Sequence, residues 1–424
     1  MKKILVKGPA LTRSGYGEQS RFALRALRSR PDLYDIYIEP ISWGKTGWLF
    51  ENNEEKKWID SMIGKTIIYQ NSGGKFDISL QVTIPNEWEN IAAVNVGYTA
   101  GIETTRVAPV WVEKGNIMDR IIVVSNHSKN TYEGTSYTIS NSETKEVVNS
   151  SFRCHTPIDV VGYPVRKFKP SDIDLKLDYD FNFLVVSQWG PRKNIENTIS
   201  WFVEEFKNEE VGLVLKANIT KNSVIDREYT LKLVTDMLEK YQDRKCKIYL
   251  LHGDMTDEEM TSLYVHPQIK ALINIAHGEG YGLPIFEAAY NGLPVVACGW
   301  SGHVDFLYAP KRDKKKKKTV IKAHFANVQY NLAPVQKEAV WDGVVEKDSS
   351  WCYADEKSYK EKIKNVYKQY GVYQRFAKSL KKHVEVNFSE EKMYGKFVAS
   401  IEKSFEGKNI MPDLPKYEPE VMVM

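Results

Sequence analysis

The sequence is poor in cysteine and in net charge, and both shortages exclude classes of protein. It has four cysteines in 424 residues and a formal net charge of +4 at pH 7. The cysteines are scattered and lack metal-ligand spacing, which predicts reduced thiols and excludes a disulfide framework or a zinc site. They are Cys154, Cys246, Cys298 and Cys352. A charge this small does not by itself indicate a partner.

Long apolar runs are also missing. No run approaches the length of a membrane span, and the N-terminal run Ile4-Leu5-Val6 is too short for a signal peptide. We therefore expect a cytoplasmic protein, with contact to the inner face of a membrane left open as peripheral binding. The length allows two domains of ordinary size, and an apolar content of 42% supports substantial cores.

The most informative stretch reads HGEGYGLPIFE, at residues 277–287. A short apolar run before it predicts a strand, and the composition from Leu283 onward predicts a helix. Gly280 and Gly282 bracket the turn between them, where backbone without Cβ can approach a ligand. The beginning of the helix presents free N–H groups and partial positive charge, which favours phosphate.

Two carboxylates flank this turn. Glu279 lies in the turn, and Glu287 lies one helical turn past Leu283. Because phosphate repels carboxylates, we expect both to accept hydrogen bonds from hydroxyls. Phosphate between two sets of hydroxyls describes a nucleotide sugar, with Glu279 towards the sugar, Glu287 towards the ribose, and Tyr281 among the donor contacts. The alternative is an ordinary strand–turn–helix with Glu287 solvated.

The order of glutamates, glycines and prolines at 279–287, followed by NGLPVV at 291–296, resembles the signature of retaining glycosyltransferases with the GT-B fold, of the family-4-like, glutamate-pair type. The resemblance implies an α/β protein with two Rossmann-like, doubly wound domains facing across a cleft. It also implies metal-independent transfer with retention, and a UDP- or GDP-sugar as co-substrate without a further cofactor.

The resemblance and the composition together predict a division of the chain. We expect an acceptor-side domain first, a linker, a nucleotide-sugar domain, a helix that crosses back to the first domain, and a loose tail. The expected ranges are 1–168, 169–180, 181–388, 389–411 and 412–424. Two Asp-x-Asp motifs in the linker could suggest a metal, but their place in a polar segment before a strand argues against it.

The first domain opens with a strand, a glycine-bearing loop and a helix predicted from Glu18 to Ser29. Ser14-Gly15-Tyr16-Gly17 resembles the loop that closes over donor phosphates and acceptor in the same transferases, which makes Gly15, Tyr16 and Gly17 donor-side candidates. A plain strand-to-helix connection is the alternative.

The first thirty residues hold eight basic residues and one acid, Glu18. Arg21, Arg25 and Arg28 share one helix face, which indicates either an anionic acceptor or a solvated surface. Arg21 is the acceptor-side candidate, and the acceptor could be an acidic glycan, a lipid surface or DNA. The basic run at 311–318 is typical of a mobile solvated loop, and beside a cleft it could hold phosphates of a polymer.

Further acceptor-side candidates follow the resemblance along the chain. Glu103 and Ser125 occupy matching positions, and Tyr98 stands where many members have a histidine, so no histidine role is assigned there. His127 follows a strand and could reach the cleft, or it could be a capping or surface residue.

The second domain is predicted to begin with a strand that leads into Gln188 and then into Arg192 and Lys193. Two adjacent cations before a helix suit a diphosphate, because a preplaced clamp stabilises the charge that grows as the glycosidic bond breaks. Lys193 matches the family's lysine. The family's arginine position falls on Gln188, and Arg192 can take its place. A surface lysine at a helix start is the alternative.

No pair of carboxylates suits a glycosidase mechanism. The catalytic candidates are Glu279, Lys193, Arg192 and Glu103, and the departing phosphate oxygen can itself accept the acceptor's proton. Three functions remain open: synthesis of a surface glycan or glycolipid, phage-type glycosylation of hydroxymethylated bases in DNA, and a non-catalytic sugar-nucleotide-binding module. The sugar, the base of the donor, the acceptor and the oligomeric state are not indicated.

Overall fold

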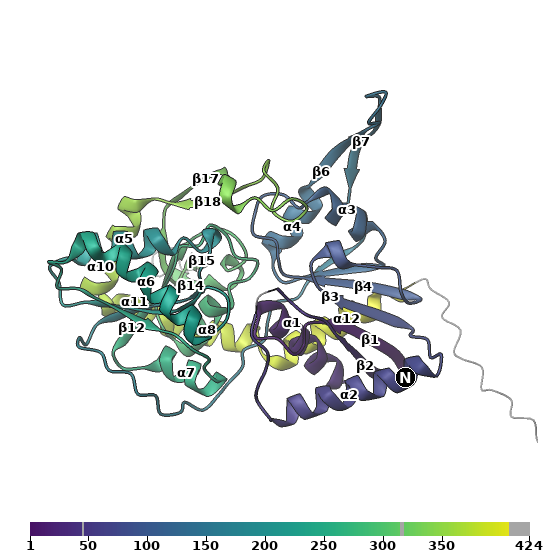
Figure 1. The fold of residues 1–424 in the computed structure, drawn as a ribbon, viewed down its shortest axis with the longest axis horizontal. Coiled ribbons are helices and arrows are strands. Elements are labelled where there is room, and N and C mark those ends of the chain that lie inside the picture. The colour runs from purple at the N-terminus through teal and green to yellow at the C-terminus, as the bar shows by residue number, and fades with distance from the viewer. Residues whose placement is uncertain (45, 314–317, 407–424) are drawn as a thin grey trace, which may run out of the picture.

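Two parallel sheets, each of six strands, organise the computed structural model, which describes residues 1–44, 46–313 and 318–406 (Figure 1). The first sheet has the order β2-β1-β3-β4-β5-β8, and all its neighbours pair in parallel. Its strands are β1 Lys2–Gly8, β2 Tyr34–Pro40, β3 Ile78–Val82, β4 Val94–Thr99, β5 Arg120–Val123 and β8 Ile158–Val160. Helix–strand alternation along the chain produces this parallel arrangement.

The helices of the first domain include three that the sequence analysis did not predict. They are α1 Gly15–Arg28, α2 Glu54–Asn71, α3 Pro109–Asn116 and α4 Asn126–Gly134, with a 3₁₀ turn η1 at Pro85–Glu87. The helices not predicted are α2, which the Asn53 side chain caps, and the shorter α3 and α4. The strands β6 Ser136–Ser140 and β7 Val147–Arg153 form a hairpin that projects from the domain (Figure 1).

Helix α1 begins earlier than predicted, at Gly15 instead of Glu18. The Ser14 side chain caps it by accepting a hydrogen bond from the Gly17 N–H at 2.9 Å. Gly15 and Gly17 therefore belong to the first helical turn and not to an open loop. A Cβ at residue 17 would lie 2.1 Å from the Thr12 carbonyl oxygen, so glycine is needed there for packing.

The second sheet has the order β11-β10-β9-β12-β13-β16 and is also parallel throughout. Its strands are β9 Asn182–Gln188, β10 Gly212–Asn218, β11 Lys247–Leu251, β12 Ile269–Asn274, β13 Val295–Cys298 and β16 Ala326–Val328. Its helices are α5 Ile195–Phe206, α6 Val224–Leu238, α7 Asp257–Val265, α8 Leu283–Asn291, α9 Val304–Leu307, α10 Glu356–Lys368 and α11 Tyr370–Asn387. Short 3₁₀ turns occur at η2 Pro191–Lys193, η3 Glu239–Tyr241 and η4 Lys337–Ala339.

Two antiparallel hairpins extend the second domain. The first is β14 Tyr308–Asp313 with β15 Lys318–Ala323, and the second is β17 Tyr330–Pro334 with β18 Ser350–Ala354. The two ends of the predicted basic run lie in the first hairpin, whereas residues 314–317 and the predicted tail at 412–424 lie outside the described residues. The second hairpin approaches the first domain, where Arg106 forms an ion pair with Asp348 (Figure 1).

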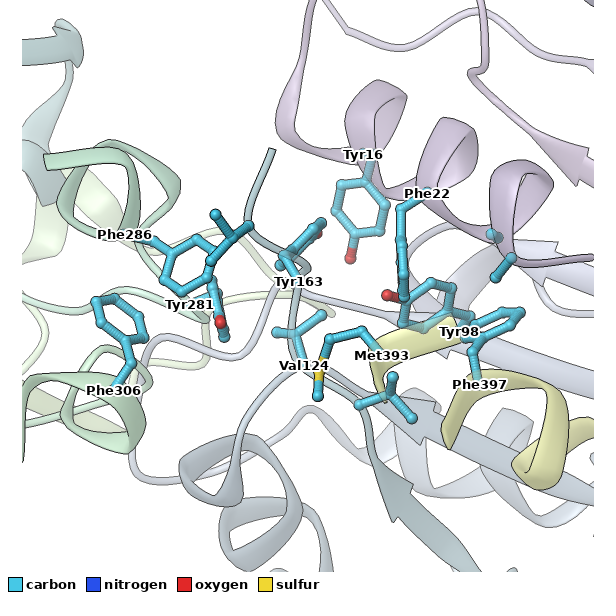
Figure 2. Packing of buried hydrophobic residues seen from close by; sticks show 14 of the residues in the cluster. Tyr16, Phe22, Tyr98, Val124, Tyr163, Tyr281, Phe286, Phe306, Met393 and Phe397 are labelled. Atoms are coloured by element: carbon cyan, nitrogen blue, oxygen red, sulfur yellow. The ribbon is translucent and has the colours of Figure 1, made fainter. Parts of the chain in front are cut away.

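The last described helix, α12 Glu390–Lys403, packs against α1 of the first domain. Its Phe397 ring lies 5.4 Å from the Phe22 ring and 5.2 Å from the Tyr98 ring, measured between centroids (Figure 2). Glu402 at its end pairs with Lys2 at 2.8 Å and accepts a hydrogen bond from the Tyr34 hydroxyl at 2.6 Å. Helix α12 thus completes one wall of the first domain.

A single aromatic core connects the two domains. Tyr163 packs against Phe22 on one side and against Tyr281 on the other, with centroid distances of 5.9 and 5.0 Å (Figure 2). Tyr281 continues the row into the second domain through Phe286 and Phe306. This continuous row of buried rings packs the two domains against each other beside the cleft. No helix of the described ranges has both the length and the apolar character needed to cross a bilayer.

Candidate active site between the two domains

A cleft of about 1370 Å³ lies between the domains, at the carboxyl ends of strands from both sheets. Open parallel sheets bind ligands at this edge. The first domain contributes the beginning of α1 and residues 100–103, and the second contributes residues 186–188, the two cations at 192–193 and the segment 279–287. Drug-sized ligands occupy pockets of roughly 300–1,000 Å³, so the cleft has room for two substrates.

A three-residue charge cluster, Glu279 with Lys193 and Arg192, forms the centre of the cleft. The Lys193 Nζ lies 2.5 Å from Glu279 Oε1, and the Arg192 guanidinium lies 3.0 Å from Glu279 Oε2. Asn274 also donates to Oε1, at 3.2 Å. Glu279 is only 5% exposed. Burial by itself raises the pKa of Glu279, but Lys193 and Arg192 hold that pKa well below its ordinary value.

The first domain joins this cluster through Glu103. Its carboxylate lies 3.4 Å from the Arg192 guanidinium, which also donates to the Gly278 carbonyl at 2.6 Å. The Arg192 carbonyl in turn accepts a hydrogen bond from the His277 N–H at 2.8 Å. Burial lowers the pKa of Lys193, and the neighbouring Arg192 lowers it further. The four predicted catalytic candidates are therefore brought together from two domains.

Glycines at 278 and 280 allow the domains to meet at this point. A Cβ at residue 278 would lie 2.0 Å from the Glu103 carbonyl oxygen, and one at residue 280 would lie 1.8 Å from the Ala100 carbonyl oxygen. We expected Gly280 to allow close approach of a ligand, whereas the structure shows close approach of the first domain's backbone. Gly282 has φ +87° at the N-cap of α8, a conformation that favours glycine.

Glu287 projects from α8 and also lines the cleft. The Tyr264 hydroxyl donates to its Oε2 at 2.7 Å. Burial raises the pKa of Glu287 to about 7; the hydrogen bond from Tyr264 opposes the rise, and the nearby Asp257 carboxylate adds to it. Glu287 is therefore the one member of the predicted glutamate pair whose charge changes near neutral pH.

We expect Glu287→Gln to raise the free energy of unfolding above pH 7 by about 1 kcal/mol. This value is smaller than the full pKa shift would give, because solvent screens a partly exposed site. The folded-state pKa, about 7, exceeds the ordinary value of 4.5. The wild-type folded state therefore holds more protons than the unfolded chain between these values, and its stability falls as pH rises through them. Urea unfolding near pH 4.5 and above pH 7 measures the difference. The surface variant Glu361→Gln is the control, and an equal gain at both pH values would contradict the assignment.

The predicted donor-side residues mostly line the cleft. They are Gly15, Tyr16, Gln188, Gly280, Tyr281, Gly282, Leu283 and Glu287. The Tyr16 hydroxyl is within 2.7 Å of Thr99 Oγ1 and accepts hydrogen bonds from the backbone N–H groups of Ala100 and Gly101. It thus fixes the loop of the first domain that faces the charge cluster. The remaining donor-side residue, Gly17, packs against Thr12 and does not line the cleft.

The predicted acceptor-side residues lie mostly outside the cleft. Tyr98 is fully buried in the core between α1 and α12. Ser125 caps α4 and donates to the Gly280 carbonyl at 2.8 Å, so it connects the domains. His127 packs against Trp300, and burial lowers its pKa to about 4. We expected these three side chains to face the acceptor side of the cleft. Tertiary packing, which the sequence does not reveal, buries them elsewhere.

Two of the three arginines on the basic face predicted for α1 are paired with acids inside the protein. Arg21 lines the cleft but donates to the carbonyls of Ala10 and Thr12 and pairs with Glu18. Arg25 pairs with Glu18 at 2.6 Å. The guanidinium of Arg28 is stacked on the Trp58 ring of α2. Arg21 and Arg25 are therefore not free to bind a polyanion, whereas Arg28 keeps an exposed charge beside Trp58.

Many residues that line the cleft escaped the sequence analysis, and three of them are prominent. Arg166 lies 3.2 Å from both Glu18 and Asp257, across the two domains, and nothing in its sequence context indicates this. Lys216 lies near the end of strand β10, and this place at a strand end could have indicated it. Trp43, also in the cleft, packs against Tyr16 at a centroid distance of 4.4 Å. Among the described residues, no group of three or more His, Cys, Asp or Glu side chains could hold a metal ion.

No protein-family model matches the chain. Part of it is similar to the serotype-specific mannosyltransferase WbdA of Escherichia coli, with 30% identity over 118 residues. That match covers 27% of this chain and 13% of WbdA, so the chain spans only a small part of this relative.

Solved structures resemble the chain over nearly its whole length. The sucrose-phosphate synthase of Thermosynechococcus elongatus has a TM-score of 0.59 at 12% identity, covering 96% of this chain and 100% of that one. A glycosyltransferase of Rickettsia africae has a TM-score of 0.57 at 14% identity, covering 96% and 99%. Anabaena HepE, in complex with UDP-glucose, has a TM-score of 0.55 at 12% identity, covering 95% and 100%. The predicted fold class is thereby confirmed: two Rossmann-like α/β domains face across a cleft, as in GT-B proteins.

Proposed function

We propose that the chain is a retaining glycosyltransferase that moves a sugar from a UDP- or GDP-sugar to an acceptor hydroxyl. The observation that carries the proposal is the pairing of Glu279 with Lys193 and Arg192 beside the beginning of α8, inside a cleft that both domains line. A buried carboxylate paired with two cations in a cleft is a typical functional arrangement, because the same cations can bind an anionic ligand.

A diphosphate would bind between the two cations and the N-terminus of α8. Lys193 and Arg192 supply the charge, and the first N–H groups of α8 supply hydrogen bonds. As phosphate oxygens take over the contacts with the cations, Glu279 is released to accept hydrogen bonds from hydroxyls of the sugar. Glu287 lies farther along α8, where it would accept from the ribose.

The transfer itself needs no protein nucleophile in this proposal. The bond from the sugar's anomeric carbon to the diphosphate oxygen breaks, and a bond from that carbon to the acceptor oxygen forms on the same face. The departing phosphate oxygen takes the acceptor's proton, so the configuration is retained and protons balance. Lys193 and Arg192 stabilise the charge on the leaving diphosphate, and Glu103 holds Arg192 from the acceptor side.

Among acceptors, we favour a surface glycan or glycolipid. The local similarity to a serotype-specific mannosyltransferase supports a hexose as the transferred sugar and a glycan as the acceptor. The alternative, glycosylation of DNA bases, depended on the basic face of α1, on the basic run at 311–318 and on the many Trp and Tyr residues. Arg21 and Arg25 are instead paired with Glu18, which weakens the support that this alternative had from α1.

Screening UDP- and GDP-sugars for thermal stabilisation and for hydrolysis tests the proposal. A ligand that binds only the folded state adds about 2.7 kcal/mol at a hundredfold excess over its Kd, so a cognate donor should raise Tm clearly. We also expect slow release of the nucleoside diphosphate, which detects turnover without the acceptor. If no nucleotide sugar raises Tm, the proposal fails. If a nucleotide sugar binds but neither hydrolysis nor transfer occurs, the chain is a binding module. Salt-sensitive binding of duplex DNA would support the DNA alternative instead.

A further inference from the structure

We propose that a second cavity, behind the loops that carry the charge cluster, binds a neutral saccharide. Its volume is about 490 Å³, which suits a mono- or disaccharide. The same two loops line both cavities with different residues. Arg192 and Glu279 face the main cleft, whereas Pro191 and His277 face the second cavity, and no residue lines both. A ligand of the second cavity would therefore not compete directly with the donor.

Aromatic rings form much of the wall of this cavity. Trp189, Tyr353 and His277 line it. The Trp189 ring is oriented by its indole N–H, which donates to Glu196 Oε1 at 2.6 Å. The His277 ring lies 4.6 Å from the Tyr353 ring, between centroids. Aromatic faces carry negative charge density and attract the weakly positive C–H groups on a pyranose face. A sugar ring can therefore pack against Trp189.

The polar groups of the cavity suit hydroxyls and disfavour anions. Glu196, Glu338 and Asn197 stand at its rim as exposed side chains, and no lysine or arginine lines it within the described ranges. Two carboxylates with no lysine or arginine among the described residues of the same wall disfavour phosphate and acidic glycans. The same oxygens accept hydrogen bonds from hydroxyls, and the amide of Asn197 can also donate. The combination selects a neutral sugar.

His277 adds an acceptor to this set. Its Nδ1 lies 2.7 Å from the Cys352 carbonyl oxygen, which can only accept, so Nδ1 carries the proton. Burial lowers the pKa of His277, so the ring is neutral at physiological pH and its Nε2 is an acceptor. A hydroxyl that enters the cavity can donate to it.

The position of the cavity connects it with the charge cluster. The His277 N–H donates to the Arg192 carbonyl at 2.8 Å, and the His277 carbonyl accepts from the Cys352 N–H at 2.8 Å. Gln336, on the far wall, donates from its side-chain amide to the Pro191 carbonyl at 3.4 Å. A saccharide bound here would rest on the segment that positions Arg192. It would thereby anchor a part of a glycan that lies away from the reacting hydroxyl.

Saturation-transfer NMR on the full chain tests this proposal with methyl α-mannopyranoside and methyl α-glucopyranoside as probes. We expect signals at ring C–H protons of at least one glycoside in the wild type. Trp189→Ala should weaken binding by at least about tenfold, because the stacking surface is lost. Glu338→Ala, a change at an exposed residue that leaves the fold intact, should weaken it as well. Trp341→Ala, which removes a 62% exposed tryptophan outside the cavity, is the matched control.

Two results would overturn the proposal. One is that neither glycoside gives a signal, or that signals persist unchanged in both Trp189→Ala and Glu338→Ala. The other is that choline binds while the glycosides do not, which would make the cavity a cation site built on aromatic rings and carboxylates. Thermal stabilisation by UDP and GDP, measured on the same samples, reports on the main cleft alone. It therefore distinguishes failure of the proposed function from failure of the saccharide site in the second cavity.

Discussion

Glu279→Gln is expected to lower the rate of sugar transfer by roughly 10²–10³-fold, the range for losing one preorganised charged contact in an active site. The amide keeps the shape of the side chain, but it carries no charge and accepts weaker hydrogen bonds from the sugar hydroxyls. It also leaves Lys193 and Arg192 without their common partner. Steady-state kinetics with the donor found by thermal screening measures the effect.

A second measurement on the same variant separates a role in binding from a role in folding. In the wild type, the diphosphate must replace Glu279 as the partner of Lys193 and Arg192. In Glu279→Gln that competition is absent, so UDP or GDP should raise Tm by more than in the wild type. Glu361→Gln, which alters a surface carboxylate beside Lys362, is the control. Unchanged transfer in the Glu279 variant, with the fold intact, would refute the role that we assign to it.

Lys193→Ala is expected to lower kcat by about 10²–10³-fold, because the leaving diphosphate gains charge in the transition state and Lys193 stabilises that charge. Nucleotide affinity should fall as well, by a smaller factor, since the ground-state diphosphate is also anionic. Lys193→Arg should recover part of the rate because it keeps the charge. The measurement is kcat and KM determined separately for each variant.

The control for this substitution is Lys207→Ala, which removes a lysine paired with Asp243 on the surface of the second domain. It should leave kcat and KM unchanged. If Lys193→Ala raised KM while kcat stayed constant, the lysine would contribute equally to substrate and transition state. That outcome would remove Lys193 from the catalytic group and leave it as a binding residue.

Motifs and residue spacing in the sequence were sufficient to predict the sheets and some helix boundaries. The resemblance at residues 279–296 implied both doubly wound domains, and the glycine-rich turn before Leu283 predicted where α8 begins. Helix α2 could also have been predicted. Asn53 is a suitable cap, and the apolar residues from Trp58 onward recur at helical spacing. The hairpins β14–β15 and β17–β18 carry weaker signals because short antiparallel strands resemble loops.

The position of side chains relative to the cleft was harder to predict. Glu18 stands three residues before Arg21 and seven before Arg25, and this spacing already allowed ion pairs along α1. Burial of Tyr98, in contrast, results from α12, which is almost three hundred residues away in sequence. Arg166 reaches the cleft only because the two domains are packed together. Such placements depend on tertiary contacts, which periodicity does not encode.

The return of α12 to the first domain has a consequence for synthesis on the ribosome. Phe22 and Tyr98 belong to the earliest part of the chain, yet the ring that covers them, Phe397, emerges near the end of the described part. While the second domain is being translated, the first presents an open apolar groove, although N-terminal domains usually fold first during synthesis. The nascent chain therefore keeps this apolar surface uncovered until α12 has been translated.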